Sequence, residues 1–296
     1  MPELPEVQTT VDGLKKKVIK RRITGVWLDA PKLIKKPKAA EFKKQIKGLK
    51  VVDIKRRGKN ILIYLTDNKQ QAINNFILLI HMKMTGHLLY GKWSIRKARP
   101  LSILGGPLQE KVNDYIHLIF YLDNGYQFAL SDLRKFAKVL FGKKNEVENS
   151  PDLAKIGPDP LDKSFKVIKF IKLIKSKKGR IKQVLMNQEI ISGIGNIYSD
   201  EILWSAKVHP LKETKKLTSK ELKNIYRETL RILKRAVELK GTSVSDYRDF
   251  SGRRGYYANE LLAYGKEGQS CKRCGTSIKR VKMGGRSAHF CPKCQR

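Results

Sequence analysis

The first residues of the chain combine a secondary amine with two carboxylates. The sequence opens with the letters MPELPE. If Met1 is removed, Pro2 presents the one kind of backbone nitrogen that condenses with an aldehyde to a cationic iminium, which is amine nucleophile chemistry. Glu3 beside it is placed to give or take protons. The alternative is that Pro5 and Glu6 only begin a helix, because proline in the first turn and a nearby carboxylate both favour helix starts.

The four cysteines form a second chemical group near the end of the chain. Their spacing is Cys271-x2-Cys274 followed by Cys291-x2-Cys294. Two such pairs are typical of a site in which two thiolate knuckles close tetrahedrally on one Zn²⁺. Sulfur fills all four positions, so the spacing predicts one structural zinc with four cysteine ligands rather than a catalytic metal. Unligated or disulfide-paired thiols are the alternative, which a reducing compartment disfavours.

The composition indicates a polyanionic partner. Lys and Arg number 63 against 27 Asp and Glu, which gives a net charge of +36 and a pI near 10.1. Such an excess favours nucleic acid, although a generally lysine-rich proteome would also produce a basic chain. With 296 residues and 41% hydrophobic content the chain can form about two domains with real cores. No membrane span and no signal segment are visible, so we expect a cytoplasmic protein without a membrane partner.

The elements that must position these residues change character along the chain. Hydrophobic residues recur on one face from Val7 to Val18, which predicts an amphipathic helix directly after the amine. Short β-rich runs then predict strands at 25–29, 51–54, 61–65 and 76–80 and a hairpin at 115–130. We expect a type I′ turn at Asn124-Gly125 in that hairpin. Antiparallel strands with one N-terminal helix favour a β-sandwich.

The second half of the chain has a helical period. A breaker-rich stretch at 151–160 indicates a linker, and helices are expected at 165–174, 180–186 and 218–239. The last of these opens with the capping box Thr218 to Glu221 and closes at Gly241. Between the two cysteine pairs, a Gly-Gly-Arg sequence predicts a two-stranded ribbon whose tip approaches a phosphate backbone.

Three separated motifs resemble one protein family. They are Pro2-Glu3-Leu4-Pro5-Glu6-Val7, then Gly193-Ile194-Gly195-Asn196-Ile197-Tyr198 with Glu201, then the zinc segment preceded by Gly255-Tyr256, Glu260-Leu261 and Tyr264-Gly265. In order and spacing they are similar to the bifunctional formamidopyrimidine-DNA glycosylases over essentially the whole chain. The resemblance implies a two-domain α+β fold: an antiparallel β-sandwich with an N-terminal helix, then a helix-two-turn-helix bundle and a β-hairpin zinc finger. We accordingly expect a catalytic domain at 1–150, a DNA-binding helical domain at 151–241, and a lesion-covering loop with the zinc finger at 242–296.

The resemblance also implies the roles of the catalytic residues. Pro2 matches the Schiff-base nucleophile that attacks the sugar C1′ of a flipped nucleotide, and Glu3 the acid that assists base release. Glu6 matches a carboxylate that organises the site. Lys59 resembles a lysine that contacts damage-side DNA and assists β-elimination, and Arg286 the finger-tip arginine linked to δ-elimination and phosphate binding.

Other positions resemble the family's DNA-binding residues. Extrusion of a base leaves a void, and the residues that match the intercalating trio are Met84, Arg134 and Phe136. The backbone-contacting positions fall on Asn113, Lys177, Lys182 and Asn196. Asn196, at a predicted helix start, suits an anion, although helix capping is the alternative.

Three departures from the family pattern affect the DNA-contacting loops. His81-Met82-Lys83-Met84 has a lysine where relatives have glycine, and 132–137 has Leu and Ala where a Pro and a Gly are usual. Asn113 takes the place of a histidine.

The resemblance implies excision of oxidised purines such as 8-oxoguanine and formamidopyrimidines from duplex DNA. Strand cleavage at the resulting abasic site by β,δ-elimination would follow, with damaged double-stranded DNA as the partner of a monomeric enzyme. An endonuclease VIII-like enzyme for oxidised pyrimidines is one alternative, against which Leu4 argues because that branch typically has glycine there. A catalytically inactive zinc-ribbon DNA-binding protein is the other.

Overall fold

The computed structural model describes residues 2–67, 75–97 and 99–296, so Met1 and its predicted removal lie outside it. The chain forms two compact units. The first comprises Met1–Ala154 and Leu239–Tyr256, and the second Lys155–Glu238 and Tyr257–Arg296. Within the described ranges, no helix combines the length and the apolar character needed to cross a membrane.

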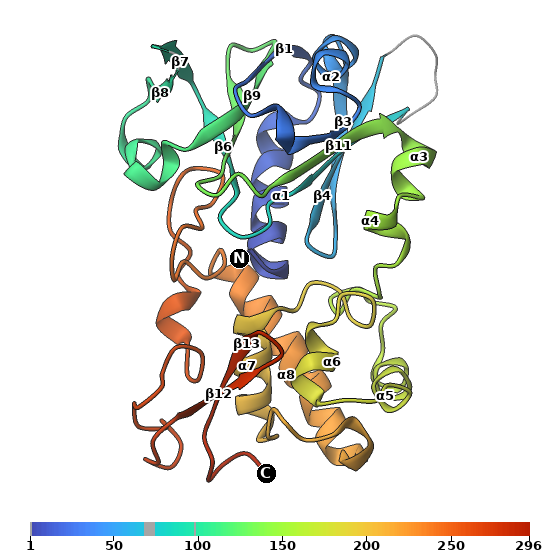
Figure 1. The fold of residues 1–296 in the computed structure, drawn as a ribbon, viewed down its shortest axis with the longest axis vertical. Helices are drawn as coiled ribbons and strands as arrows, with labels where there is room; N and C mark the ends of the chain where they lie inside the picture. The colour runs from blue at the N-terminus through green and yellow to red at the C-terminus, as the bar shows by residue number, and fades with distance from the viewer. Residues whose placement is uncertain (1, 68–74, 98) are drawn as a thin grey trace. The chain divides into compact units, whose positions relative to one another are not determined.

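The first unit is built on two main β-sheets (Figure 1). The five-stranded sheet has the order β2 (Ile34–Lys36), β11 (Lys138–Lys143), β5 (Phe76–His81), β4 (Asn60–Thr66) and β3 (Lys50–Arg57). The four-stranded sheet has the order β1 (Ile23–Leu28), β9 (Ile116–Leu122), β10 (Gln127–Ser131) and β6 (His87–Gly91). A separate ribbon pairs β7 (Trp93–Arg96) with β8 (Arg99–Ser102). All pairings are antiparallel except that of β2 with β11.

Helix α1 (Leu4–Val18) supplies one side of the core of this unit. Its apolar face, Val7, Val11, Leu14 and Val18, is fully or almost fully buried in one cluster with residues of both sheets. The predicted amphipathic helix is therefore confirmed. Packing of its apolar face against the core holds the helix, and with it the residues at its start, in place. Shorter helices complete the unit: α2 (Ala39–Ile46), α3 (Lys144–Glu148) and α4 (Pro151–Ala154), with 3-10 turns at Pro31–Leu33, Gly106–Gln109 and Lys111–Asn113.

The turn between β9 and β10 differs from the prediction. Gly125 has a φ of 74°, but Asn124 is not among the positive-φ residues, whereas a type I′ turn requires positive φ at both positions. The amide of Gly125 donates to the carbonyl of Leu122 (3.1 Å), which closes a type I turn ending in a left-handed glycine. The hairpin itself is confirmed; its loop is longer than expected.

The second unit consists of helices and a small ribbon. Its elements are α5 (Val167–Lys175), α6 (Ile181–Met186), α7 (Asn196–Ala206), α8 (Ser219–Glu238), β12 (Lys279–Met283) and β13 (Arg286–Phe290), with 3-10 turns at Thr214–Lys216 and Tyr257–Glu260. The predicted capping box is present, because Thr218 N donates to Glu221 (2.9 Å) and Glu221 N donates to the Thr218 hydroxyl (3.2 Å). Helices α5 and α7 pack on α8, and β13 packs on α7. The mixed α+β class with a C-terminal β-hairpin finger is confirmed.

The segment Leu239–Tyr256 returns to the first unit after α8. Its Phe250 carbonyl accepts a hydrogen bond from Tyr90 N (2.7 Å), and buried Arg248 forms an ion pair with Glu110 (2.8 Å). The Phe250 ring lies directly over Gly13 of α1, where an added Cβ would come within 2.0 Å of it. Gly13 is therefore required for close approach rather than for backbone freedom.

We expect Gly13→Ala to destabilise the protein by about 1–3 kcal/mol through overpacking, against the gain of about 1 kcal/mol that alanine gives inside a helix. Urea unfolding of the variant measures the sign. In a Phe250→Ala background the same substitution should become stabilising. An equal effect of Gly13→Ala in both backgrounds would contradict the assigned contact.

Candidate functional site

The predicted amine and carboxylates lie at the buried start of α1. Pro2, Glu3 and Glu6 are all buried, with Glu3 at 2% and Glu6 at 1% exposure. A reciprocal capping box joins the two acids: Glu3 N donates to the Glu6 carboxylate (2.7 Å), and Glu6 N is bound by the Glu3 carboxylate. Both acids thereby satisfy amide groups that a helix start leaves open. Helix capping and a chemical role are thus compatible in this stretch.

Glu6 also binds the returning segment. Its second carboxylate oxygen accepts a hydrogen bond from Thr242 N (2.7 Å), and its carbonyl accepts one from the Tyr247 hydroxyl (3.3 Å). Gly241, at a φ of 83°, passes so close that a Cβ there would lie 2.8 Å from the Glu6 carboxylate. Burial raises the pKa of Tyr247 well above its usual range, and the charge of Glu6 acts in the same direction. Tyr247 therefore remains a hydrogen-bond donor throughout the physiological range.

Lys59 lies in the tight turn that joins β3 to β4. Arg57 and Asn60 pair across this turn, and Lys59 is only 6% exposed although it lies in a loop. Asn60 in turn pairs with His81 on β5. Burial, together with the charges of Lys83 and Lys59, lowers the pKa of His81 to about 3. His81 is therefore neutral near pH 7, beside a lysine that is not an ordinary solvated surface residue.

The loops that carry Met84, Arg134 and Phe136 are held together by one buried aspartate. Asp132, fully buried, accepts hydrogen bonds from the Thr85 hydroxyl and from Ala137 N (2.7 Å). The Thr85 hydroxyl in turn accepts one from Arg134 N (3.2 Å). The structure thus brings together two stretches that are about fifty positions apart in the sequence.

The three predicted void-filling residues are exposed rather than part of the core. Met84 is 43% and Phe136 53% exposed, and the Arg134 guanidinium lies over the Phe136 ring at 4.4 Å. An exposed apolar pair beside a stacked guanidinium has the chemistry required to fill a gap in a base stack.

Lys83, at the position where the family pattern implied by the sequence has glycine, adopts a φ of 56°. This left-handed conformation is one that glycine adopts readily and that a residue with a Cβ adopts at a cost. Its amide donates to His81 Nδ1 (3.0 Å), which fixes the imidazole under the loop.

Asn113 does not present its amide to solvent. It is 1% exposed, its nitrogen donates to the Pro107 carbonyl (2.7 Å), and its oxygen pairs with His87 Nε2 (2.9 Å). Burial lowers the pKa of His87, so this ring is neutral and donates to Asn113. The predicted DNA contact of Asn113 stays a prediction, while the structure gives its side chain a supporting position.

In the second unit, Asn196 begins α7 as predicted. Its side-chain oxygen is buried and has no hydrogen-bond partner within the described ranges. The loop before it is held by Gln188, which donates to the Met186 and Ile194 carbonyls (2.7 Å each) and accepts from Gly193 N (2.8 Å). Gly193 has a φ of 91°, a conformation that favours glycine at this motif position.

Lys182 forms a buried ion pair instead of projecting from the surface. Its ammonium, fully buried, contacts Asp200 (2.5 Å), the Ser287 carbonyl (3.0 Å) and the Asn196 carbonyl (3.4 Å). Asp200 also binds the His289 ring (2.8 Å). Lys182 thus joins the start of α7 to the strand that follows Arg286. Lys177, by contrast, is partly exposed, and its carbonyl accepts from the Thr214 hydroxyl.

The finger has the geometry of a metal site. The four cysteine sulfurs all lie within 4.8 Å of one another, and those of Cys274 and Cys291 are 3.4 Å apart. Tetrahedral thiolates around Zn²⁺ are separated by roughly 3.8 Å, since each Zn–S bond is about 2.3 Å, so these sulfurs fit one structural zinc. The ribbon turns at Gly284 and Gly285, both with positive φ, and leaves Arg286 exposed at its tip. This ribbon is the one that the sequence predicted.

The structure thus assembles the predicted residues in two groups. One, in the first unit, contains Pro2, Glu3, Glu6, Lys59, Met84, Asn113, Arg134 and Phe136. The other, in the second unit, contains Lys177, Lys182, Asn196, Arg286 and the four cysteines. Sequence reasoning missed the supporting residues Asp132, Thr85, Gln188 and Asp200. The sequence offered a weak signal for two of them only: Asp132 begins the stretch 132–137, and Asp200 directly precedes Glu201 of the second motif.

These features define an α+β protein with a β-sandwich, a helix-two-turn-helix region and a four-cysteine zinc ribbon. The model of the formamidopyrimidine-DNA glycosylase N-terminal domain matches residues 1–139, that of the H2TH domain of the same enzymes 156–248, and that of the zinc finger found in FPG and IleRS 268–296. The formamidopyrimidine-DNA glycosylase of Desulforamulus reducens is 35% identical to this chain, and the match covers 100% of this chain and 99% of that protein. The formamidopyrimidine-DNA glycosylase of Streptococcus mutans is 36% identical, and the match covers 100% of both chains.

Solved structures agree with these matches. A mutant of the Lactococcus lactis FPG in complex with Fapy-dG containing DNA has a TM-score of 0.85 at 32% identity, over 100% of both chains. The Lactococcus lactis Fpg bound to abasic-site DNA has a TM-score of 0.84 at 31% identity, over 99% of both chains. The chain belongs to the formamidopyrimidine-DNA glycosylase family. The resemblance inferred from its motifs is confirmed, and the finger is a structural zinc site with four cysteine ligands.

Substituting Lys83 by glycine should raise the pKa of His81, because one of the charges that lowers it is removed. Because folding lowers the pKa of this histidine, the protein becomes less stable as pH falls below about 6.5. The loss of stability between neutral and acidic pH should therefore be smaller in the variant. NMR titration of His81 and unfolding between about pH 7 and 4 measure both effects. Lys207→Gly, at a φ of 61°, is the matched control that relieves the same strain without affecting His81.

Replacing Asp200 by alanine should cost about 3–5 kcal/mol, because the Lys182 ammonium would remain buried without its partner. Chemical unfolding measures the loss. Glu213→Ala removes an exposed ion pair with Lys216 in the same unit and should change stability far less. Similar losses in the two variants would contradict the importance of burial.

Proposed function

We propose that this enzyme removes oxidised purines from duplex DNA through a Schiff base on Pro2 and then cleaves the strand. The main observation that supports this proposal is the reciprocal capping box of Glu3 and Glu6, in which the Glu6 carboxylate also accepts a hydrogen bond from Thr242 N. It fixes the amine-bearing end of the chain, which is ordinarily frayed, on a buried helix start. Family membership and the structures of relatives bound to Fapy-dG DNA and abasic-site DNA support the substrate class.

In the proposed chemistry the Pro2 nitrogen attacks the sugar C1′ and the glycosidic bond breaks. The base leaves with a proton, while the adjacent Glu3 assists opening of the sugar. The resulting iminium acidifies the C2′ hydrogens, so one amine serves both base release and β-elimination of the 3′ phosphate. δ-Elimination then releases the 5′ phosphate. Because an α-amino group ordinarily titrates at about 7.7–8.0, a useful fraction of Pro2 would be neutral near pH 7.

The remaining residues would hold the DNA. Met84, Arg134 and Phe136 would fill the space of the extruded base, and Lys59 and Arg286 would contact phosphates near the reacting sugar. Asn196 would present its amide and the free N–H groups of α7 to a phosphate. Asn113 and Lys182, whose polar atoms already have protein partners, would act by supporting their neighbours. The enzyme would act as a monomer in the cytoplasm, associated with the nucleoid through DNA. Its catalytic domain would comprise residues 1–150 and its helical DNA-binding domain residues 151–241. The lesion-covering loop and the zinc finger would comprise residues 242–296.

A form with a cleavable extension before Pro2 tests the nucleophile. We expect the extended protein to release no base and to give no borohydride-trapped complex with DNA, and its cleavage to Pro2 to restore both. Intact mass confirms each form. Glu3→Gln is the matched control: it should still be trapped on abasic DNA, where no base remains to be released, yet fail on 8-oxoguanine DNA. Trapping of the extended protein would refute Pro2 as the nucleophile.

A further inference from the structure

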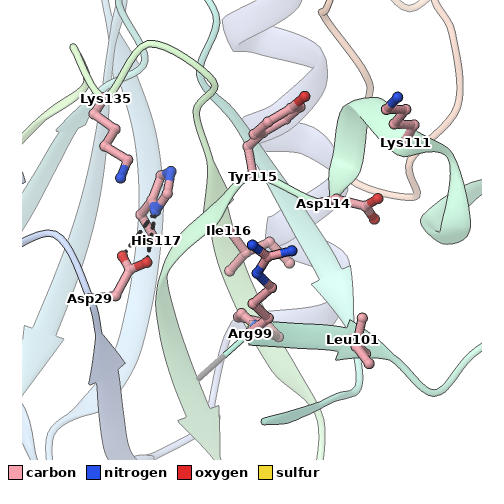
Figure 2. A pocket seen from close by; sticks show the side chains of 10 residues that line it. Asp29, Arg99, Leu101, Lys111, Asp114, Tyr115, Ile116, His117 and Lys135 are labelled. Carbon is pink, nitrogen blue, oxygen red and sulfur yellow. Dashed lines mark hydrogen bonds and ion pairs between the residues drawn. The ribbon is translucent and has the colours of Figure 1, made fainter. Parts of the chain in front are cut away.

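A pocket of about 490 Å³ lies in the first unit, apart from the residues assigned to excision. It is lined by Asp29, Arg99, Pro100, Leu101, Lys111, Asp114, Tyr115, Ile116, His117 and Lys135. Figure 2 shows side chains from the β8 ribbon, the start of β9 and the loop after β10 around this space. The volume falls in the range of small-ligand sites, which is about 300–1,000 Å³.

His117 at the start of β9 is the buried polar group of this pocket. The residue is 7% exposed, and its Nδ1 lies 2.9 and 3.1 Å from the two carboxylate oxygens of Asp29. Its other ring nitrogen, Nε2, is buried and has no hydrogen-bond partner among the residues that the structure describes. In Figure 2 the imidazole lies between Asp29 and the Lys135 side chain. Buried polar atoms are rarely left without a partner, so Nε2 indicates a ligand or solvent atom.

The charges of the pocket favour an anion. Arg99, Lys111 and Lys135 line it, and one of its two carboxylates, Asp29, is already engaged by the imidazole. The other, Asp114, has its pKa raised by burial and lowered again by Lys111 to a lesser degree. A divalent cation would find two carboxylates and one imidazole, but it would also face the like charges of three cationic side chains that line the same space. Tyr115 adds an aromatic face at the edge of the space.

We propose that this pocket is a phosphate-binding site in which His117, oriented by Asp29, donates from Nε2 to a phosphate oxygen, with Arg99 as the nearby charged contact and Lys111 adding positive charge to the lining. Both carboxylate oxygens of Asp29 lie within hydrogen-bond distance of Nδ1, so this pair fixes the ring orientation and leaves Nε2 for the ligand. Lys135 adds to the attraction for the phosphate.

The phosphate can come from two sources. Lys135 lies between Arg134 and Phe136, so a backbone phosphate of bound DNA is one source, and a free nucleoside monophosphate is the other. The first source rests on the proposed DNA-binding role of those neighbours. Neither source needs base excision, so lesion-free DNA and small phosphates test the pocket without the catalytic proposal.

The first experiment is calorimetric titration of the full chain with inorganic phosphate and with a 2′-deoxynucleoside 5′-monophosphate. The variants are Arg99→Ala with Lys111→Ala, and separately His117→Gln. The matched control is Arg21→Ala with Lys16→Ala, two exposed cations of the same unit outside the pocket. We expect binding about tenfold weaker in each pocket variant, as for the loss of a hydrogen bond to a charged group, and no change in the control. The Arg99 and Lys111 variant keeps the test valid if His117→Gln fails to fold.

The second experiment measures the affinity for lesion-free duplex DNA as a function of salt. If the phosphate belongs to DNA, the slope of log K against log salt should fall by about 0.9 for the lost contact in the Arg99 and Lys111 variant relative to the control. If it belongs to a free nucleotide, the slope should match the control while phosphate binding is lost. The proposal is overturned if wild type binds neither small phosphate and the two double variants have the same salt slope.

Discussion

The carboxylate of Glu6 is the group on which the candidate catalytic end of the chain depends. One oxygen holds Glu3 N at the start of α1, and the other holds Thr242 N in a segment more than two hundred residues away. Hydrogen bonds to a buried carboxylate are strong, so movement of either backbone donor away from Glu6 is costly. The position of Pro2 is therefore set by the local capping box and by the contact with the returning segment together.

The second unit uses the same device with opposite charge. The Lys182 ammonium is fully buried among acceptors from α7 and from β13, so the start of α7 and the arginine-bearing strand share one charged centre. Glu201, the next residue after Asp200, accepts hydrogen bonds from three successive amides at Leu262, Ala263 and Tyr264, at 2.8 to 3.0 Å. Burial raises the pKa of Glu201, and these three amides oppose that effect. Helix α7 thus carries two neighbouring acids that both position chain segments.

Much of this arrangement could be predicted from the sequence, because it rests on local rules. The stripe from Val7 to Val18, the Thr218 capping box and the cysteine spacing each specify a structure within a few residues. The partners of buried polar groups could not be predicted in this way. Nothing in the sequence indicates that Asp132 ties Thr85 to Ala137, or that Lys182 is buried in so basic a chain. The prediction for the Asn124-Gly125 turn failed for a related reason: the dipeptide allows positive φ at both residues, but the register of the two strands decides whether it is used.

The glycine turn of the finger determines where the arginine at its tip points. Met283 pairs with Arg286 across two glycines, and successive side chains of a strand point to opposite faces. Insertion or deletion of one residue at Gly284-Gly285 would alter this register and turn Arg286 to the other face while leaving the metal ligands intact. The length of this turn therefore decides which face of the ribbon carries Arg286, and it does so independently of the four cysteines.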